Sequence, residues 1–242
     1  MALEKMKLLL ENWRQYLNEG EEDFFPWLRE LNSLDNPTSA DIIKKFPNWS
    51  VLGRGSYRVT FQPPGEKDYV VKVVREKSKN YTSAGEVQRQ NEAEFKIGAN
   101  FPQIFPKSYS HHPEYDWIVV ENIKVFPSMR SRDVLKSLKK SFPKLVSFID
   151  DVYYGGLSSF QNTGDILEYI LAAATKGTEY EVGVFTPKLE KVFEFGMKYS
   201  KVFRELHRVI NEFSNDISDI SHGNIGKGSD GRFVILDASV FD

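Results

Sequence analysis

The spacing of apolar residues in this sequence changes near residue 130, and this change limits the folds that the chain can adopt. Before that point, apolar residues alternate or form continuous β-branched runs, which is typical of strands. The expected strands cover residues 49–52, 57–61, 69–74 and 117–120. After that point, apolar residues recur at spacings of three and four, which is typical of helices. These helical stripes cover residues 134–142, 166–174 and 189–210, and Thr186-Pro187 is suited to start the last of them.

Two short segments complete the expected pattern. A polar stretch compatible with a helix, residues 86–96, separates the third and fourth strands, and a strand at 233–236 follows the turn GKGSDGR. We therefore expect an α+β protein with two lobes, a small and mostly antiparallel β lobe with one helix and a mainly helical second lobe. The expected division is an N-terminal helical extension at 1–48, the β lobe at 49–122 and the helical lobe with the closing strand at 123–242.

Charge and composition exclude several classes of protein. The 242 residues include 32 Lys and Arg and 34 Asp and Glu, a formal net charge of −2, so no overall basic field supports a nucleic-acid partner. The sequence contains no cysteine, which rules out disulfides and thiol catalysis. No apolar run approaches the roughly 20 residues that cross a bilayer, so we expect no membrane partner and a cytoplasmic location.

Lys72 is the only charged residue of the third expected strand, YVVKVV. Because both faces of this strand are apolar, a buried ammonium there would cost several kcal/mol unless an anion meets it. Glu92 and Glu94, on the following helix, are the candidate partners. A lysine held in this way can direct its ammonium at nucleotide phosphates. The alternative is that Lys72 lies on an exposed edge and reaches water.

Gly53 and Gly55 lie in LGRGSYRV, between the first two expected strands. Glycines allow backbone amides to approach a phosphate closely, because no Cβ holds the ligand away. The alternative interpretation is an ordinary hairpin turn.

Three polar residues are spaced along DISDISHGNIGKGSDGRFVILDAS, residues 216–239: Asp219, Asn224 and Asp237. Asn224 and Asp237 offer the hard oxygen ligands that Mg²⁺ prefers, and a hairpin would fold them toward each other. Asp219 would then be available to orient a hydroxyl and accept its proton. The alternative is a solvated acidic loop followed by a strand.

The order of these motifs resembles that of the protein-kinase-like superfamily, most closely the compact kinase-like proteins of tailed bacteriophages. LGRGSYRV, VVKVV, the helix glutamate, IVVENI, DISHGN and ILDAS follow one another as in that family. The resemblance implies ATP and Mg²⁺ as cofactors, with Asp219 and Lys72 as catalytic residues and Asn224 and Asp237 as metal ligands. It implies that Gly53, Gly55, Lys72, Glu92 and the hinge residue Glu121 bind the nucleotide, with Glu92 the preferred partner of Lys72 and Glu94 the reserve.

Departures from the family pattern affect the expected function. Ile217-Ser218 replaces the family's His-Arg, Arg58 replaces the third glycine, and Asp237 is followed by Ala238-Ser239 and only a few more residues. We therefore expect a fold that lacks the region after the metal-binding segment. The expected activity is phosphoryl transfer to a hydroxyl of a host or viral protein or of a small molecule. The alternative is a pseudokinase that binds nucleotide or a host protein without turnover.

The N-terminal segment has two interpretations. Residues 5–18 form an amphipathic pattern that predicts a helix docked on the body of the protein. The segment also resembles the leaders of tailed-phage head proteins, which are cut after a Leu-x-Glu pattern that Leu17-Asn18-Glu19 would fit. On that interpretation the protein is packaged in the virion and its mature chain begins at Gly20.

Overall fold

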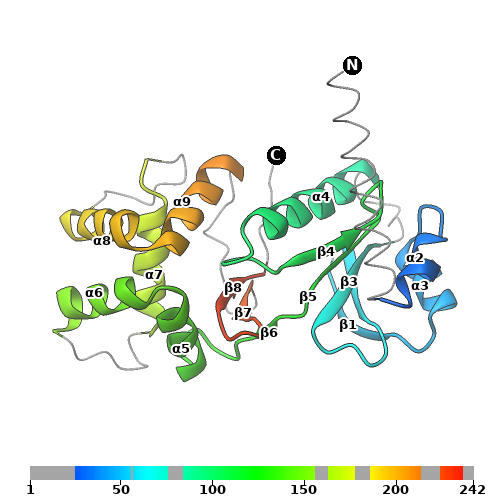
Figure 1. The fold of residues 1–242 in the computed structure, drawn as a ribbon, viewed down its shortest axis with the longest axis horizontal. Helices are drawn as coiled ribbons and strands as arrows, with labels where there is room; N and C mark the ends of the chain where they lie inside the picture. Colours follow the sequence, from blue (N-terminus) through cyan, green and yellow to red (C-terminus); the bar gives the residue numbers. More distant parts are fainter. Residues whose placement is uncertain are drawn as a thin grey trace, which may run out of the picture.

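The computed structural model describes residues 25–55, 57–75, 84–155, 163–177, 186–213 and 224–236. A five-stranded sheet and a group of helices occupy opposite ends of the molecule, with a small three-stranded sheet between them (Figure 1). The two-lobed α+β fold expected from the sequence is thereby confirmed. The amphipathic segment at 5–18 and the Leu17-Asn18-Glu19 motif lie outside the described residues.

The five-stranded sheet has the order β1-β2-β3-β5-β4, and every neighbouring pair is antiparallel. Its strands are β1 (Ser50–Arg54), β2 (Arg58–Gln62), β3 (Tyr69–Val74), β4 (Ser108–His111) and β5 (Trp117–Glu121). All four strands predicted for this lobe are confirmed within two residues. The fifth, β4, is an edge strand whose sequence, SYSH, lacks the apolar alternation that predicts a strand.

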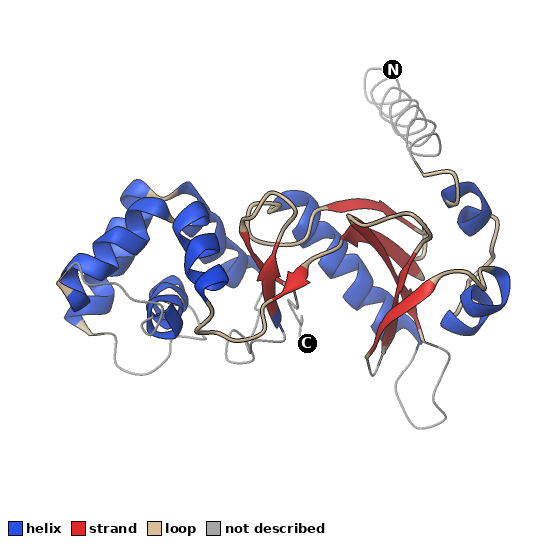
Figure 2. Ribbon diagram, turned by 90° about the horizontal axis from the view of Figure 1, so that it is seen from below, coloured by secondary structure: helices blue, strands red, loops and turns tan. Residues whose placement is uncertain are grey.

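Helices cover both faces of this sheet (Figure 2). Helices α2 (Leu28–Asn32) and α3 (Ser39–Lys45) pack on one face, where they share an apolar cluster with the sheet. This cluster includes Phe25, Leu28, Leu31, Ile42, Phe46, Trp49, Val59, Phe61, Val71, Val73, Trp117 and Val119. Helix α4 (Ala84–Asn100) covers the other face, which presents Val70, Ile118 and Val120. The strand alternation therefore places Lys72 beneath α4, between the apolar residues on either side of it.

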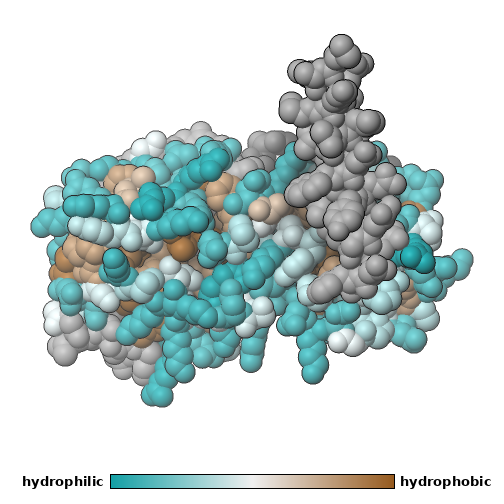
Figure 3. All heavy atoms as spheres, in the orientation of Figure 1, coloured by the Kyte–Doolittle hydropathy of each residue, from teal (hydrophilic) through white to brown (hydrophobic). Residues whose placement is uncertain are grey.

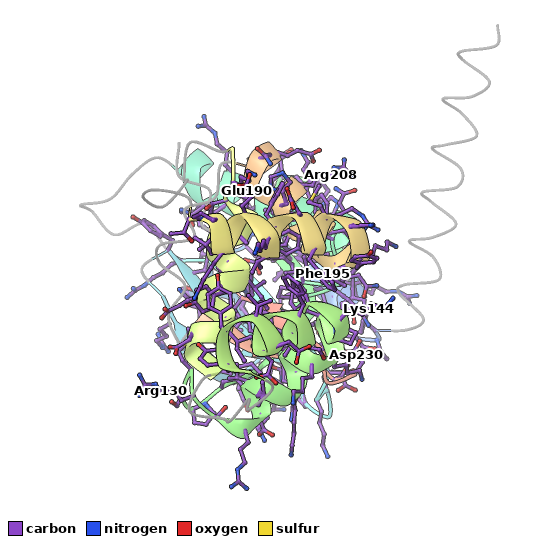
Figure 4. The ribbon with its side chains drawn as sticks, turned by 90° about the vertical axis from the view of Figure 1, so that its left-hand side faces the viewer. Arg130, Lys144, Glu190, Phe195, Arg208 and Asp230 are labelled. Carbon is purple, nitrogen blue, oxygen red and sulfur yellow. The ribbon has the colours of Figure 1, made fainter. Side chains whose placement is uncertain are left out.

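The helical lobe consists of α5 (Arg132–Ser141), α6 (Pro143–Tyr154), α7 (Thr163–Ala174), α8 (Pro187–Tyr199) and α9 (Lys201–Phe213). The start of α8 is as predicted, because the Thr186 hydroxyl accepts a hydrogen bond from the Leu189 amide at 3.3 Å and Pro187 takes the first helical position. The Phe195 ring, labelled in Figure 4, stacks on Phe148 of α6 with ring centroids 4.1 Å apart. Figure 3 shows hydrophobic residues, in brown, on the visible surface of this lobe.

The apolar stripe at 189–210, expected as one long helix, is interrupted at Ser200. The Ser200 backbone is extended there, and its hydroxyl accepts a hydrogen bond from the Phe203 amide at 3.1 Å, which caps α9. Gly196 allows α9 to approach α8, since a Cβ on Gly196 would lie 2.5 Å from the Phe203 ring. The chain therefore folds back on itself at a point where the apolar spacing continues.

The three-stranded sheet joins the two lobes. It has the order β6-β7-β8, with β6 (Lys124–Val125), β7 (Ile225–Lys227) and β8 (Phe233–Ile235), so the predicted closing strand is confirmed. Ile225, Phe233 and Ile235 enter the core of the helical lobe. The segment after α4 enters the same core, and the Ile235 amide donates to the Ile104 carbonyl at 2.8 Å.

Candidate functional site

Lys72 forms an ion pair with Glu94 across the interface between β3 and α4. The pair is largely buried: the Lys72 side chain is 14% exposed and the Glu94 side chain 7%. The sequence analysis predicted that an anion would meet Lys72, and the structure confirms this expectation. It excludes the alternative of a lysine on an exposed edge, because β3 lies at the centre of the sheet.

The prediction that Glu92 is the preferred partner of Lys72 was wrong. Glu92 lies on a more exposed side of α4 and pairs with Lys96 of the same helix at 2.6 Å. Glu94, the reserve, faces the sheet instead. The reason is helical geometry, since two residues along a helix correspond to a rotation of about 200° around its axis.

Arg58 is a second cation on Glu94, and the sequence analysis did not predict it. Lys72 donates to one oxygen of the Glu94 carboxylate, Oε1, and Arg58 Nη1 donates to the other, Oε2. Nη1 of Arg58 also donates to Asn91 Oδ1 at 3.3 Å, and Asn91 is fully buried. The sequence feature that could have indicated this role is the arginine at position 58, where the family has its third glycine. Arg58 is also the first residue of β2.

These two cations decide the charge of Glu94. Burial by itself raises the pKa of Glu94, but the charges of Lys72 and Arg58 and the hydrogen bonds that they donate outweigh it. The net pKa is lower than that of an ordinary glutamate, so Glu94 is ionised at neutral pH. The site therefore holds one buried carboxylate between two cationic side chains.

The glycine segment forms a tight connection between β1 and β2. The Gly55 amide donates to the Arg58 carbonyl at 2.9 Å, and the Gly55 carbonyl accepts from Arg75 Nη1 at 3.2 Å. Gly53 pairs with Thr60 after an irregularity in β1, and a Cβ on Gly53 would meet nothing within 4 Å. The segment therefore connects β1 and β2 as a hairpin that uses the Gly55 amide within the turn, and phosphate binding by the segment stays a prediction.

Glu121, expected at the hinge as a nucleotide-binding residue, has its side chain buried within the protein. Its carboxylate forms a two-bond ion pair with Arg232, of which the Nη1–Oε1 bond is 3.0 Å. It also accepts from the Ser229 amide at 3.1 Å and the Lys107 amide at 3.3 Å. The Glu121 side chain is 1% exposed and that of Arg232 is 6% exposed. The Glu121 amide is engaged as well, since it donates to the Lys107 carbonyl at 2.8 Å, and nucleotide binding by Glu121 stays a prediction.

The three polar residues of the C-terminal segment are only partly described. Asn224 precedes β7, and its carbonyl accepts from the Leu236 amide at 2.8 Å, so the two ends of the hairpin are adjacent. A hairpin was predicted at this place from the sequence. Asp219 and Asp237 lie outside the described residues. Within the described residues, no cluster of three or more His, Asp or Glu side chains is suited to bind a metal ion.

Comparisons with known proteins return distant structural neighbours. No protein-family model and no curated protein sequence matches the chain. The similar solved structures include the gentamicin complex of APH(2'')-IIa, with 13% identity, 84% of this chain and 70% of that chain covered, and a TM-score of 0.36. They also include ADP-bound aminoglycoside phosphotransferase APH(2'')-Ib, with 12% identity, 82% of this chain and 68% of that chain covered, and a TM-score of 0.35. A third neighbour is choline kinase LicA from Streptococcus pneumoniae, with 15% identity, 82% of this chain and 66% of that chain covered, and a TM-score of 0.31.

Neighbours this distant do not transfer an activity, and the resemblance to tailed-bacteriophage proteins stays a prediction. Across the described ranges, no helix has the length and apolar character needed to cross a membrane.

Proposed function

We propose that the chain is a nucleotide-dependent phosphotransferase of the kinase-like type that acts on a hydroxyl group. The observation that carries this proposal is the ion pair of Lys72 and Glu94 between the central strand β3 and helix α4. The geometry fits a phosphate ligand, because the lysine is held in place by a buried carboxylate while part of its side chain stays exposed. A lysine ammonium has three donors, so it can contact phosphate oxygens while Glu94 still orients it.

The proposed roles of the other residues follow from their chemistry. Asn224 and Asp237 would hold Mg²⁺ through oxygen atoms, and the bound ion would neutralise negative charge on the phosphates. Asp219 would orient the acceptor hydroxyl and accept its proton. ATP is the proposed nucleotide, bound through Lys72 and, on the family resemblance, through the Gly53–Gly55 segment and the main-chain carbonyl of Glu121.

Binding and transfer are tested together. Isothermal titration with ATP, with and without Mg²⁺, measures affinity, and transfer of radiolabelled phosphate is followed with an aminoglycoside, choline and a host-cell lysate as acceptors. Lys72→Met should lower ATP affinity by about tenfold or more, because it removes the ammonium while the aliphatic stem still packs. The control is Lys96→Met, which removes an exposed ammonium from the neighbouring helix α4.

Each outcome has a distinct meaning. ATP affinity that is the same in Lys72→Met and Lys96→Met would remove Lys72 from the site and contradict the proposal. ATP binding without transfer to any acceptor would favour the pseudokinase alternative. Labelling of one acceptor class would identify the substrate as a small molecule or as a protein.

A further inference from the structure

Helix α4 contacts the sheet through a row of polar side chains. Gln88, Asn91 and Glu94 follow one another at a spacing of three, which places them along one side of the helix. Gln88 Nε2 donates to Asp116 Oδ1 at 2.7 Å, and Asn91 Nδ2 donates to the Tyr115 carbonyl at 2.8 Å. Gln88 and Asn91 therefore bind the helix to the β4–β5 connection, and Glu94 binds it to β2 and β3.

Arg58 joins two members of this row. Its Nη1 donates both to Asn91 and to Glu94, so one guanidinium nitrogen contacts two side chains that lie three residues apart on α4. In the β2–β3 register, Arg58 pairs with Val74 and Thr60 pairs with Lys72. Arg58 and Lys72 are thus one strand apart and two positions out of register, and their side chains reach the same carboxylate from adjacent strands.

This arrangement changes what happens to Glu94 when Lys72 engages a phosphate. If Lys72 were its only charged partner, the buried carboxylate of Glu94 would have to share that one ammonium with the phosphates whenever a nucleotide bound. The Arg58 guanidinium occupies the second oxygen, so Glu94 keeps a charged partner and α4 keeps its position. Glu94 therefore does not depend on Lys72 alone to compensate its charge in this buried position.

We propose that Arg58 is a positioning residue of the nucleotide site, which acts through Glu94 to keep α4 docked and Lys72 available for the phosphates. The inference rests on the proposed function, since it assumes that Lys72 contacts nucleotide. It assigns a role to the position at which the family's third glycine is replaced. Both contacts come from Nη1, a nitrogen with two N–H donors, and the guanidinium that carries it stays charged throughout the physiological pH range.

The experiment measures ATP affinity by isothermal titration, and thermal unfolding without nucleotide, for five variants of the full chain. Arg58→Gln should lower ATP affinity by about tenfold, and Arg58→Lys by a smaller factor of about two to five. Arg208→Gln makes the same chemical change on the exposed surface of α9 and should stay within about twofold of the unmodified protein. The decisive pair is Glu94→Gln and the double variant with Arg58→Gln. If Arg58 acts through Glu94, then Arg58→Gln should cause no further loss once Glu94 is changed.

The outcomes separate this inference from the proposed function. Unchanged affinity in Lys72→Met would overturn the proposed function and this inference with it. Weakened binding in Lys72→Met but unchanged binding in Arg58→Gln would overturn the inference alone. An equal loss from Arg58→Gln with and without Glu94 would also overturn it, because Arg58 would then contact the nucleotide directly. If Arg58→Gln does not fold, Arg58→Lys carries the test, and affinity equal to that of the unmodified protein would overturn the inference.

Discussion

The buried pair of Glu121 and Arg232 allows a sharp prediction about stability. Glu121→Gln keeps the size of the side chain but removes its charge, and it turns an amide donor toward groups that already donate to this position. Among the described residues, the Arg232 guanidinium, 6% exposed, then keeps only the half-exposed carboxylate of Asp230, at 3.0 Å, as a charged partner. Removing one member of a buried pair costs about 3–5 kcal/mol of unfolding free energy. For a chain of this length, that corresponds to a fall of roughly 6–20 °C in the melting temperature.

The control is Glu92→Gln, the same chemical change in an exposed pair. Glu92 pairs with Lys96 four residues later, and both side chains are more than a third exposed. Such a pair contributes about 0.3–0.5 kcal/mol, so the melting temperature of Glu92→Gln should change by no more than roughly 2 °C. Differential scanning calorimetry of both variants at pH 7 measures the difference.

A double variant tests the reason for the loss. Glu121→Gln combined with Arg232→Met removes both buried charges, so the double variant should be more stable than Glu121→Gln alone. Equal melting temperatures for Glu121→Gln and Glu92→Gln would refute the reasoning about burial. A double variant less stable than Glu121→Gln alone would refute the reasoning about an uncompensated charge.

The pH dependence follows from the charge of Glu121. Burial by itself raises the pKa of Glu121. The hydrogen bonds and charge of Arg232, together with the hydrogen bonds from the Lys107 and Ser229 amides, lower this pKa by more, so the net pKa is below that of an ordinary glutamate. A carboxyl whose pKa is lower in the folded state stabilises the protein above its unfolded pKa, about 4.3, and this contribution is lost as the pH falls through the folded pKa. The gap in melting temperature between the unmodified protein and Glu121→Gln should therefore narrow below pH 4.3.

Three further predictions concern the helical lobe and the C-terminal segment. Thr186→Ala removes the cap of α8 and should cost about 1 kcal/mol in urea unfolding, whereas Thr186→Ser should cost little. Gly196→Ala places a Cβ 2.5 Å from the Phe203 ring and should cost about 1–3 kcal/mol, a loss that Phe203→Leu in the same chain should reduce. On the proposed function, Asp219→Asn should lower phosphoryl transfer by roughly 10²-fold with ATP affinity within a few fold, while Asp237→Asn should lower the Mg²⁺-dependent part of ATP binding as well. Equal loss of binding in both would contradict this division of roles.

Much of the β lobe could be predicted because its strands are short runs of apolar residues with a clear beginning and end. The sequence also carried the information needed to choose between Glu92 and Glu94. Across residues 87–100, the part of α4 whose burial is described, the buried residues are Val87, Asn91, Glu94, Ile97 and Gly98, a spacing of three and four that excludes Glu92. The motif order of a distant family led to the wrong residue at a place where helical periodicity identifies the right one.

Other features could not be read from the spacing of apolar residues. The break between α8 and α9 falls within a continuous stripe, because Ser200 and Gly196 redirect the chain without changing which residues face the core. The pairing of Glu121 with Arg232 joins residues that are 111 positions apart in the chain. Only the assembled three-stranded sheet brings them together, and nothing in either local sequence indicates the other.

Helix α4 packs both on one face of the five-stranded sheet and in the core of the helical lobe, which limits how the two lobes can move. Phe95 packs on Val70, Ile118 and Val120 of the five-stranded sheet, while Ile97, and Phe101 just after the helix, pack in the core of the helical lobe. A rigid rotation of the two lobes about residues 121–123 would have to pull this helix out of one core or the other. We therefore expect the two lobes to melt in a single calorimetric transition, and access to the space between them to depend on local rearrangement of loops rather than on wide opening of the lobes.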